Sequence, residues 1–191
     1  MKTRFKSACV AEAALLIFCL AASGEQPGRW ISRGLGGGGA FYGPSISPYD
    51  PAELYAQTDM SGFFRSRDGG RSWKTLDFRQ IGGGNLNSSL QFTSVPATLY
   101  ALNYRPDGVG DSVAPTRSTD GGLTWSALAG DPCNADGLSC HADPDATNRL
   151  LVSTETEIWV STNSGATFSL KYTDPACHVA GVHWEGSRIL V

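Results

Sequence analysis

Acidic side chains in predicted loops are the residues of this chain that could do acid–base chemistry. Asp59 lies in the segment Thr58-Asp59-Met60-Ser61-Gly62, where its carboxylate could act as a general base or could close an ordinary Asx-turn. Hydrolysis in which a base activates a water also needs a general acid, about 6.5–9.5 Å from the base when the water lies between the two. Nothing in the sequence marks another loop acid as that partner; the candidates are Asp107, Asp111, Asp131, Asp136, Asp143 and Asp145.

A second set of polar residues belongs to a repeated motif and is predicted to be structural. Ser-x-Asp-x-Gly-x-x-Trp occurs fully at residues 66–73 and 118–125, and a third copy at 161–168 has Asn and Phe in the Asp and Trp positions. Asp and Ser side chains bond nearby backbone N–H groups in tight turns, and Gly adopts backbone conformations that a Cβ penalises. The aromatic residue buries a large apolar area. The structural positions are Ser66, Asp68, Gly70, Trp73, Ser118, Asp120, Gly122, Trp125, Ser161, Asn163, Gly165 and Phe168.

The elements around each motif copy are predicted to be short β-strands. Apolar and β-branched runs such as 54–58, 99–102 and 157–161 are bounded by Gly, Pro, Asp and Asn, which is typical of strands. The spacing of the motif suits one blade of a β-propeller, roughly 40–50 residues. The sequence therefore predicts an all-β propeller, here an incomplete set of about three and a half blades. The blades are expected at about 40–78, 88–130 and 140–173, with the start of a fourth at 178–191.

An incomplete propeller raises the question of how its ends are covered. Propellers close with about four to eight blades. The chain is therefore expected to be a fragment of a larger propeller, and the alternative is a small protein that closes by self-association.

Cysteine and glycine patterns are expected to be structural as well. Cys133, Cys140 and Cys177 are disulfide candidates, with a local Cys133–Cys140 bridge and a Cys140–Cys177 bridge as the two alternatives. The adjacent Cys-His pairs at 140–141 and 177–178 do not have the spacing of zinc ligands, so no metal is predicted. The Gly-rich stretch 34–39 is not followed by Gly-Lys-Ser/Thr, so no nucleotide and no other cofactor is predicted.

The N-terminal segment and the net charge limit where the protein can be located and what kinds of partner it can bind. Three basic residues precede an apolar core at 13–22 and small residues at 23–24, which predicts a secretory signal peptide at 1–23 and a secreted or periplasmic protein. An apolar core of about ten residues is too short to span a bilayer, so no membrane association is expected after cleavage. The net charge of −3 and the lack of a basic stripe argue against nucleic acid as a partner.

The repeated motif resembles the Asp-box, or BNR repeat, of sialidases, sortilin-like receptors and several glycoside hydrolases. In those proteins the Asp-box is structural and lies away from the active face, so the fold class expected here is a β-propeller with Asp-box repeats. The segment 36–65 is moreover similar to the opening blade of xyloglucanases and oligoxyloglucan cellobiohydrolases of glycoside hydrolase family 74. That blade runs from a Gly cluster to Leu-Tyr-Ala-x-Thr-Asp-x-Gly-Gly-x-Tyr-Arg, and Ser61 and Phe64 depart from the pattern.

The family 74 resemblance implies a role for Asp59 as general base. The general acid of that family comes from a second propeller, which this chain does not contain, so the chain alone is expected to be inactive. Blade topology supports a functional position for Asp59, because its turn joins strands two and three and lies opposite the Asp-boxes, on the rim that carries the long inter-blade loops. Aromatic residues that could stack on sugar rings, or pack in the core, are Phe41, Tyr42, Tyr104 and Trp184.

The predicted function is therefore that of an exported, carbohydrate-active propeller. A polysaccharide or oligosaccharide is the expected partner, with a xyloglucan-like β-glucan as substrate of an inverting glycoside hydrolase. The alternative is a non-enzymatic, protein-binding propeller similar to sortilin domains or photosystem assembly factors.

Overall fold

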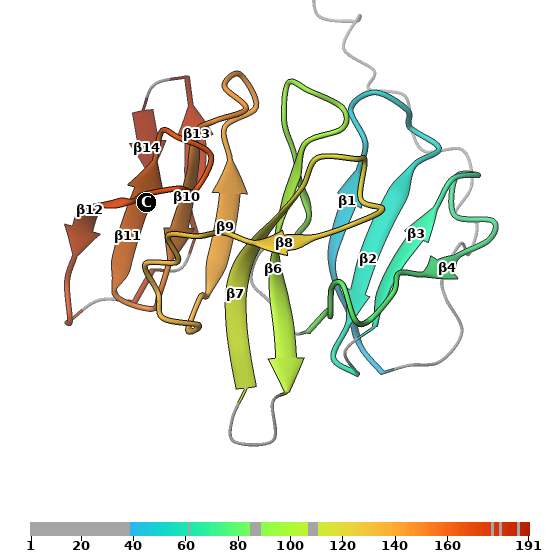
Figure 1. Ribbon diagram of the computed structural model, residues 1–191, viewed down its shortest axis with the longest axis horizontal. Helices are drawn as coiled ribbons and strands as arrows, with labels where there is room; N and C mark the ends of the chain where they lie inside the picture. Colours follow the sequence, from blue (N-terminus) through green and yellow to red (C-terminus); the bar gives the residue numbers. More distant parts are fainter. Residues whose placement is uncertain are drawn as a thin grey trace, which may run out of the picture. The chain divides into compact units, whose positions relative to one another are not determined.

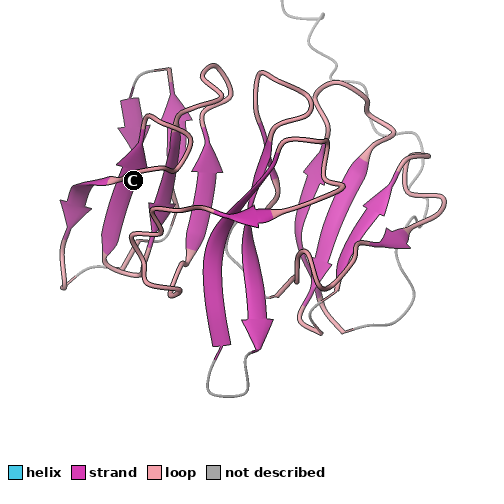
Figure 2. Ribbon diagram, viewed as in Figure 1, coloured by secondary structure: helices cyan, strands magenta, loops and turns pink. Residues whose placement is uncertain are grey.

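Strands follow one another in groups of four along the chain. The computed structural model describes residues 39–60, 62–84, 89–106, 111–176, 178–179, 181–186 and 188–191, and these residues form strands, turns and loops without a helix (Figure 2). The first sheet contains β1 (Phe41–Ile46), β2 (Leu54–Thr58), β3 (Phe63–Ser66) and β4 (Lys74–Thr75). The second contains β5 (Gln91–Phe92), β6 (Leu99–Pro106), β7 (Asp111–Ser118) and β8 (Ser126–Ala127). The third contains β9 (Ser139–Ala142), β10 (Leu150–Ser153), β11 (Glu157–Ser161) and β12 (Ser169–Thr173), and a last pair is β13 (His183–Glu185) and β14 (Arg188–Leu190).

Each four-stranded sheet is an antiparallel meander whose strands keep the order of the chain (Figure 1). Such a sheet is one propeller blade, and β13–β14 supply the first two strands of a fourth. The prediction of an all-β, incomplete propeller is thereby confirmed. The predicted signal peptide and residues 34–38 of the Gly-rich stretch lie outside the described residues. In the part of the chain that the structure describes, no helix is long and apolar enough to cross a membrane.

In each four-stranded blade, the second strand contributes more buried hydrophobic residues than any other strand. All four residues of β10 are buried, because this strand has sheet neighbours on both sides and a packed layer on each face. Its first three residues, Leu-Leu-Val, are accordingly apolar without alternation, which is typical of strands buried on both faces. The same position in the first two blades is Leu-Tyr-Ala, at 54–56 and 99–101.

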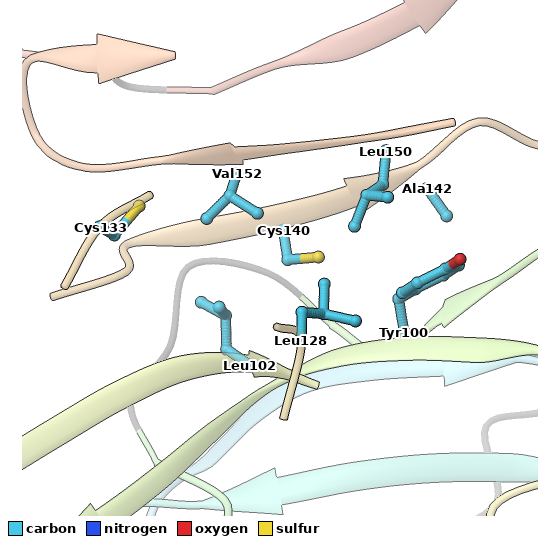
Figure 3. Packing of buried hydrophobic residues seen from close by; sticks show 8 residues of the cluster. All are labelled: Tyr100, Leu102, Leu128, Cys133, Cys140, Ala142, Leu150 and Val152. Atoms are coloured by element: carbon cyan, nitrogen blue, oxygen red, sulfur yellow. The ribbon is translucent and has the colours of Figure 1, made fainter. Parts of the chain in front are cut away.

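One apolar cluster fills each interface between successive sheets. The first interface is built by Tyr55, Phe63, Ile81, Leu90, Leu99, Ala101 and Trp125. The second is built by Tyr100, Leu102, Leu128, Cys133, Cys140, Ala142, Leu150 and Val152 (Figure 3). The third is built by Leu151, Ile158, Val160, Val179 and Trp184. The sheets are therefore held together face to face by burial of apolar side chains rather than by shared strands.

Each repeated motif closes the connection between strands three and four of its blade. The serine hydroxyl accepts a hydrogen bond from the glycine amide four residues later, at 2.8 Å in the first two copies and 2.9 Å in the third. The three glycines have φ of 79°, 83° and 81°, a left-handed backbone that disfavours a Cβ. A Cβ on Gly165 would also lie 2.4 Å from Leu128, so this glycine is needed for packing between blades two and three.

The acidic residue of the motif bonds the far side of the same turn. Asp120 Oδ1 accepts from the Thr124 amide at 2.9 Å and its Oδ2 accepts from the Thr124 hydroxyl at 2.6 Å. Asp68 makes the equivalent bonds to Ser72, and Asn163 replaces them with Oδ1 and Nδ2 contacts to Thr167. These hydrogen bonds lower the pKa of Asp68 and of Asp120 to about 2. A carboxylate held in this way is a poor proton acceptor near neutral pH, so these residues serve the turn.

The motif aromatics are not equally buried. Trp125 is 7% exposed, lies in the first inter-blade cluster and donates its indole N–H to the Gly122 carbonyl at 3.3 Å. Phe168 is partly buried against the second cluster. Trp73 is half-buried and lies outside all three clusters. The reason is that blade one presents Trp73 on the face that no other described sheet covers.

Candidate functional site at the Asp59 rim

Asp59 lies in a tight turn between β2 and β3. The Thr58 amide donates to the Gly62 carbonyl at 2.9 Å, and the Gly62 amide donates to the Thr58 hydroxyl at 3.1 Å. Asp59 is exposed, and its Oδ1 accepts a hydrogen bond from the Ala40 amide at 3.1 Å. An exposed carboxylate that is oriented by one backbone N–H keeps lone pairs for a water molecule or a ligand hydroxyl. We call the end of the blades that carries this turn the Asp59 rim.

Gly39 determines where the Asp59 carboxylate can lie. Its φ is 85°, and a Cβ built on it would lie 1.9 Å from Oδ1 of Asp59. The carboxylate therefore occupies the space that a side chain at position 39 would fill. Nothing in the Gly-rich stretch of the sequence indicates this contact between Gly39 and Asp59, which are 20 residues apart.

A glycine strap of residues 82–84 joins the Asp59 turn to the second blade. A Cβ on Gly83 would lie 2.3 Å from the Gly62 carbonyl, and a Cβ on Gly82 would lie 2.2 Å from the Tyr104 carbonyl. The Gly82 amide donates to the buried Asn103 Oδ1 at 2.8 Å, and the Tyr104 amide donates to the Gly82 carbonyl at 3.1 Å. The roles of the strap and of Asn103 were not predicted from the sequence. The signal for the strap is its three consecutive glycines between two strands, which indicate close approach of backbone segments.

Three of the four predicted sugar-binding aromatics lie near this rim. Phe41 and Tyr42 pair across the sheet with Thr58 and Gln57, directly before Asp59. Phe41 is 43% exposed, which leaves its ring available to a ligand. Tyr104 is half-buried and its ring covers Gly84, where a Cβ would lie 3.2 Å away. The structure thus places Phe41 and Tyr42 on the strand beside the Asp59 turn, with their side chains on opposite faces of the sheet, and places Tyr104 across the glycine strap.

Trp184, the fourth predicted aromatic, packs in the core, which is the second of the two roles that the sequence left open. Its side chain is 8% exposed and belongs to the third inter-blade cluster. The indole N–H donates to the His141 carbonyl at 3.2 Å, and the Arg149 guanidinium lies over the ring at 4.7 Å. Packing of β13 against the third blade therefore uses the face that a sugar would need.

The predicted local disulfide is also corrected. Cys133 is a buried free thiol, so it forms no bridge with Cys140. Figure 3 shows the reason: the Cys140 sulfur, on β9, points away from Cys133 into the apolar cluster. Burial raises the pKa of the Cys133 thiol to about 12, so it stays protonated and unreactive near neutral pH. Cys177, the other predicted partner of Cys140, lies outside the described residues.

The remaining loop acids do not form a pair with Asp59 in any contact of the described residues. Asp143 is buried and its Oδ2 lies 2.7 Å from the Arg149 guanidinium, and Asp131 accepts hydrogen bonds from the amides of Cys133 and Ala135 at 2.9 and 2.8 Å. Asp136 lines a hollow of about 460 Å³ together with Glu155, next to the β10–β11 turn of blade three. That turn corresponds to the Asp59 turn of blade one, so this hollow lies on the same rim. Asp107 lies outside the described residues, as does the side chain of Asp111.

A separate groove lies away from Asp59, between the outer strands of blades one and two. It has a volume of about 420 Å³ and an apolar floor that includes Ile81 and Trp125. Its charged lining residues are the basic Arg65, Arg67 and Lys74 and the acidic Asp68 and Asp77. Within the described ranges, no group of three or more His, Cys, Asp and Glu side chains could hold a metal ion.

Solved propellers resemble this chain in structure. YCF48 from Cyanidioschyzon merolae superposes with a TM-score of 0.53 and 22% identity, over 72% of this chain and 38% of that one. A GH74 enzyme of Niastella koreensis gives 0.53 and 22%, over 77% of this chain and 20% of that one. The GH74 xyloglucanase from Xanthomonas campestris gives 0.52 and 25%, over 74% of this chain and 22% of that one. No protein-family model and no curated protein matches the chain.

The chain thus spans about a fifth of the two GH74 enzymes and 38% of that YCF48. Blades of four antiparallel strands, joined through one apolar cluster at each interface, account for the structural similarity. The predicted resemblance is confirmed: this chain has a β-propeller fold that resembles the propellers of GH74 xyloglucanases and of YCF48.

Proposed function

We propose that this chain is part of an exported, carbohydrate-active propeller that binds a xyloglucan-like β-glucan at the Asp59 rim, with Asp59 as general base. The observation that carries the proposal is the exposed Asp59 carboxylate, which the Ala40 amide orients at 3.1 Å and which follows Thr58, the strand partner of the exposed Phe41. The similarity to a structure described as a xyloglucanase supports the choice of substrate class. Export rests on the predicted signal peptide.

The chemical role of Asp59 follows from its position. In inversion, a base removes a proton from the water that attacks the anomeric carbon while an acid protonates the leaving oxygen. Asp59 has an exposed carboxylate for the first task. The second task needs a carboxyl group that the whole protein would supply, so this chain is expected to bind the glycan without cleaving it.

Binding by the full chain is the first test. Isothermal titration with a xyloglucan oligosaccharide should show binding, and Phe41→Ala should weaken it several-fold because a stacking surface is removed. Asp59→Asn should leave binding largely unchanged, because the amide keeps the size and the acceptor oxygen. A chain that folds but binds no xyloglucan oligosaccharide would reject the proposal.

Catalysis is tested in a full-length homologue that contains both propellers. Asn at the position of Asp59 cannot accept a proton from water, and loss of a general base lowers the rate by about 10²–10⁴. Asn at the position of Asp145, an exposed acid on the β9–β10 connection, is the matched control and should keep full activity. Unchanged hydrolysis by the first variant would remove Asp59 from the mechanism.

A protein-binding propeller is the second candidate, and the groove between blades one and two favours it. The lining combines apolar side chains with three basic and two acidic residues, and this small positive excess suits a peptide with apolar and acidic side chains. A similar fold has been solved as YCF48 bound to a D1 peptide. Binding of an acidic peptide that Lys74→Glu abolishes, together with no glycan binding, would favour this function over the first.

A further inference from the structure

One position of the repeat comes at the end of strand two in each four-stranded blade. The leucines that pair with the motif serines align the blades, and they are Leu54, Leu99 and Leu150. Four residues after these leucines stand Thr58, Asn103 and Thr154 respectively. In blades one and three the threonine closes its own turn: Thr58 Oγ1 accepts from the Gly62 amide at 3.1 Å, and Thr154 Oγ1 accepts from the Glu157 amide at 3.1 Å.

Asn103 differs from its two equivalents in the segment that it binds. Its Oδ1 accepts a hydrogen bond at 2.8 Å from the amide of Gly82, in the connection that precedes blade two. Gly82 is buried and Asn103 is 6% exposed, so water cannot easily replace this acceptor. The Tyr104 amide adds a backbone bond to the Gly82 carbonyl at 3.1 Å. Because a buried N–H without an acceptor is strongly disfavoured, the Asn103 side chain holds the start of the glycine strap on β6.

The strap in turn lies against the residue that closes the Asp59 turn. A Cβ on Gly83 would lie 2.3 Å from the Gly62 carbonyl oxygen, so the two backbones are in contact. The same carbonyl accepts from the Thr58 amide at 2.9 Å. On its other side Gly62 has no free space, since a Cβ there would lie 2.5 Å from the Phe64 ring and 2.8 Å from Thr58 Oγ1. Gly62 is therefore enclosed between its own sheet and the strap.

We propose that Asn103 is a positioning residue for Asp59. Asn103 holds the strap, and the strap keeps Gly62 and its turn where the Asp59 carboxylate accepts from the Ala40 amide at 3.1 Å. A residue of blade two thus fixes the carboxylate of blade one. The inference rests on the function proposed for Asp59, because a general base must lie within hydrogen-bond reach of its water. A misplacement of about 1 Å can lower the rate of an enzyme by about 10²-fold.

Nuclear magnetic resonance of the full chain tests the proposal, with the Ala40 amide proton as reporter. Its bond to a carboxylate is charge-assisted, and Asp59→Asn gives the signal position without that charge. Asn103→Leu keeps the approximate size but has no acceptor, so it should move the Ala40 signal most of the way to the Asp59→Asn position. Asn103→Asp keeps an acceptor oxygen and should restore the signal.

The Thr124 amide is the internal control. It bonds to the Asp120 carboxylate at 2.9 Å on the opposite rim of blade two, so its signal should stay in place in the Asn103 and Asp59 variants. An Ala40 signal that does not respond to Asn103→Leu would overturn the proposal. A Thr124 signal that moves as far as the Ala40 signal would overturn it too, because it would indicate a general loss of structure.

Gly83→Ala and Gly84→Ala are a matched pair that tests the strap directly, including the case in which Asn103→Leu does not fold. Neither glycine has a positive φ, so the two variants differ in what the new Cβ meets. At Gly83 it meets the Gly62 carbonyl at 2.3 Å, whereas at Gly84 it meets the Tyr104 ring at 3.2 Å. Gly83→Ala should move the Ala40 signal and Gly84→Ala should not. Equal effects of the two variants would overturn the proposal.

Failure of the proposed function gives a different result. A chain that binds no xyloglucan oligosaccharide, but whose Ala40 signal responds to Asn103→Leu, would reject the glycan proposal and support the coupling of Asn103 to Asp59. Hydrolysis that depends on the base at the position of Asp59, with an Ala40 signal indifferent to Asn103→Leu and to Gly83→Ala, would reject the positioning role alone.

Discussion

The Ala40 amide donates a hydrogen bond to Oδ1 of Asp59 at 3.1 Å, and the Asp59 amide donates to the Ala40 carbonyl at 3.2 Å. This reciprocal pair fastens the β2–β3 turn to the segment before β1 and orients the carboxylate while leaving it exposed. Because the two partners are 19 residues apart in the chain, the orientation depends on the pairing of β1 with β2.

Gly39→Ala should displace the Asp59 carboxylate and lower the free energy of unfolding. The new Cβ would meet Oδ1 at 1.9 Å, and a left-handed backbone adds about 1–2 kcal/mol for a residue with a Cβ. Urea denaturation measures the loss. Gly69→Ala is the matched control, since Gly69 has a φ of 69° but nothing within 4 Å of the added Cβ. Equal losses for the two variants would contradict the clash with Asp59.

Trp125→Ala should lower the free energy of unfolding by about 3–5 kcal/mol, the usual effect of deleting a buried aromatic side chain. Trp73→Ala should have a clearly smaller effect, because that ring is half-buried and lies outside the inter-blade clusters. The two tryptophans occupy the same place in the same motif, so each is the control for the other. Equal losses in urea denaturation would show that burial between blades does not govern the difference.

The stability of the chain should fall as the pH is lowered from about 4 to about 2, and Asp120→Asn should reduce that dependence. The folded-state pKa of Asp120 is about 2, below its ordinary value, because the Thr124 hydroxyl and amide bond the ionised form. A lowered carboxyl pKa stabilises the fold above the unfolded pKa, and this contribution is lost as the pH falls through the folded one. Asn163 makes the equivalent bonds in the third motif, so the substitution should preserve the turn. Parallel acid titrations of the two proteins, followed by fluorescence, make the comparison.

His141→Gln should reduce a second loss of stability, on acidification from neutral pH. Burial lowers the pKa of His141, and the charge of His183 lowers it further. The neutral ring therefore stabilises the fold fully above its unfolded pKa of about 6.5, and that contribution disappears as the pH falls through the lower folded value. His183→Gln should flatten the dependence only slightly, because burial is the larger cause. Thermal unfolding measured between neutral and mildly acidic pH distinguishes the two variants.

The blade fold could be predicted from the sequence because the residues that specify its turns and strands are close to one another in the chain. The repeated Ser, Gly and aromatic positions specify a turn within eight residues, and the strand-like runs on either side specify antiparallel neighbours. The Asp59 turn could be located in the same way, because the residues that close it, Thr58 and Gly62, are its immediate neighbours.

Contacts between segments that are far apart in the chain could not be predicted from local sequence patterns. Trp184 looked like a stacking surface, but β13 lies on blade three and buries the ring under Arg149. The need for glycine in the strap follows only from the fold, because folding places the strap against the backbone of Gly62 and of Tyr104.

The sequence by itself determined the blade, its turns and the position of Asp59 on the rim opposite the motifs. Only the tertiary structure decided which equivalent residues are covered. Trp73 and Trp125 occupy one position of the repeated motif, yet Trp125 is buried between two sheets and Trp73 is only half-buried. The physical reason is that burial of a sheet face depends on the next sheet, whose placement is a property of the stack and not of the residues within one blade.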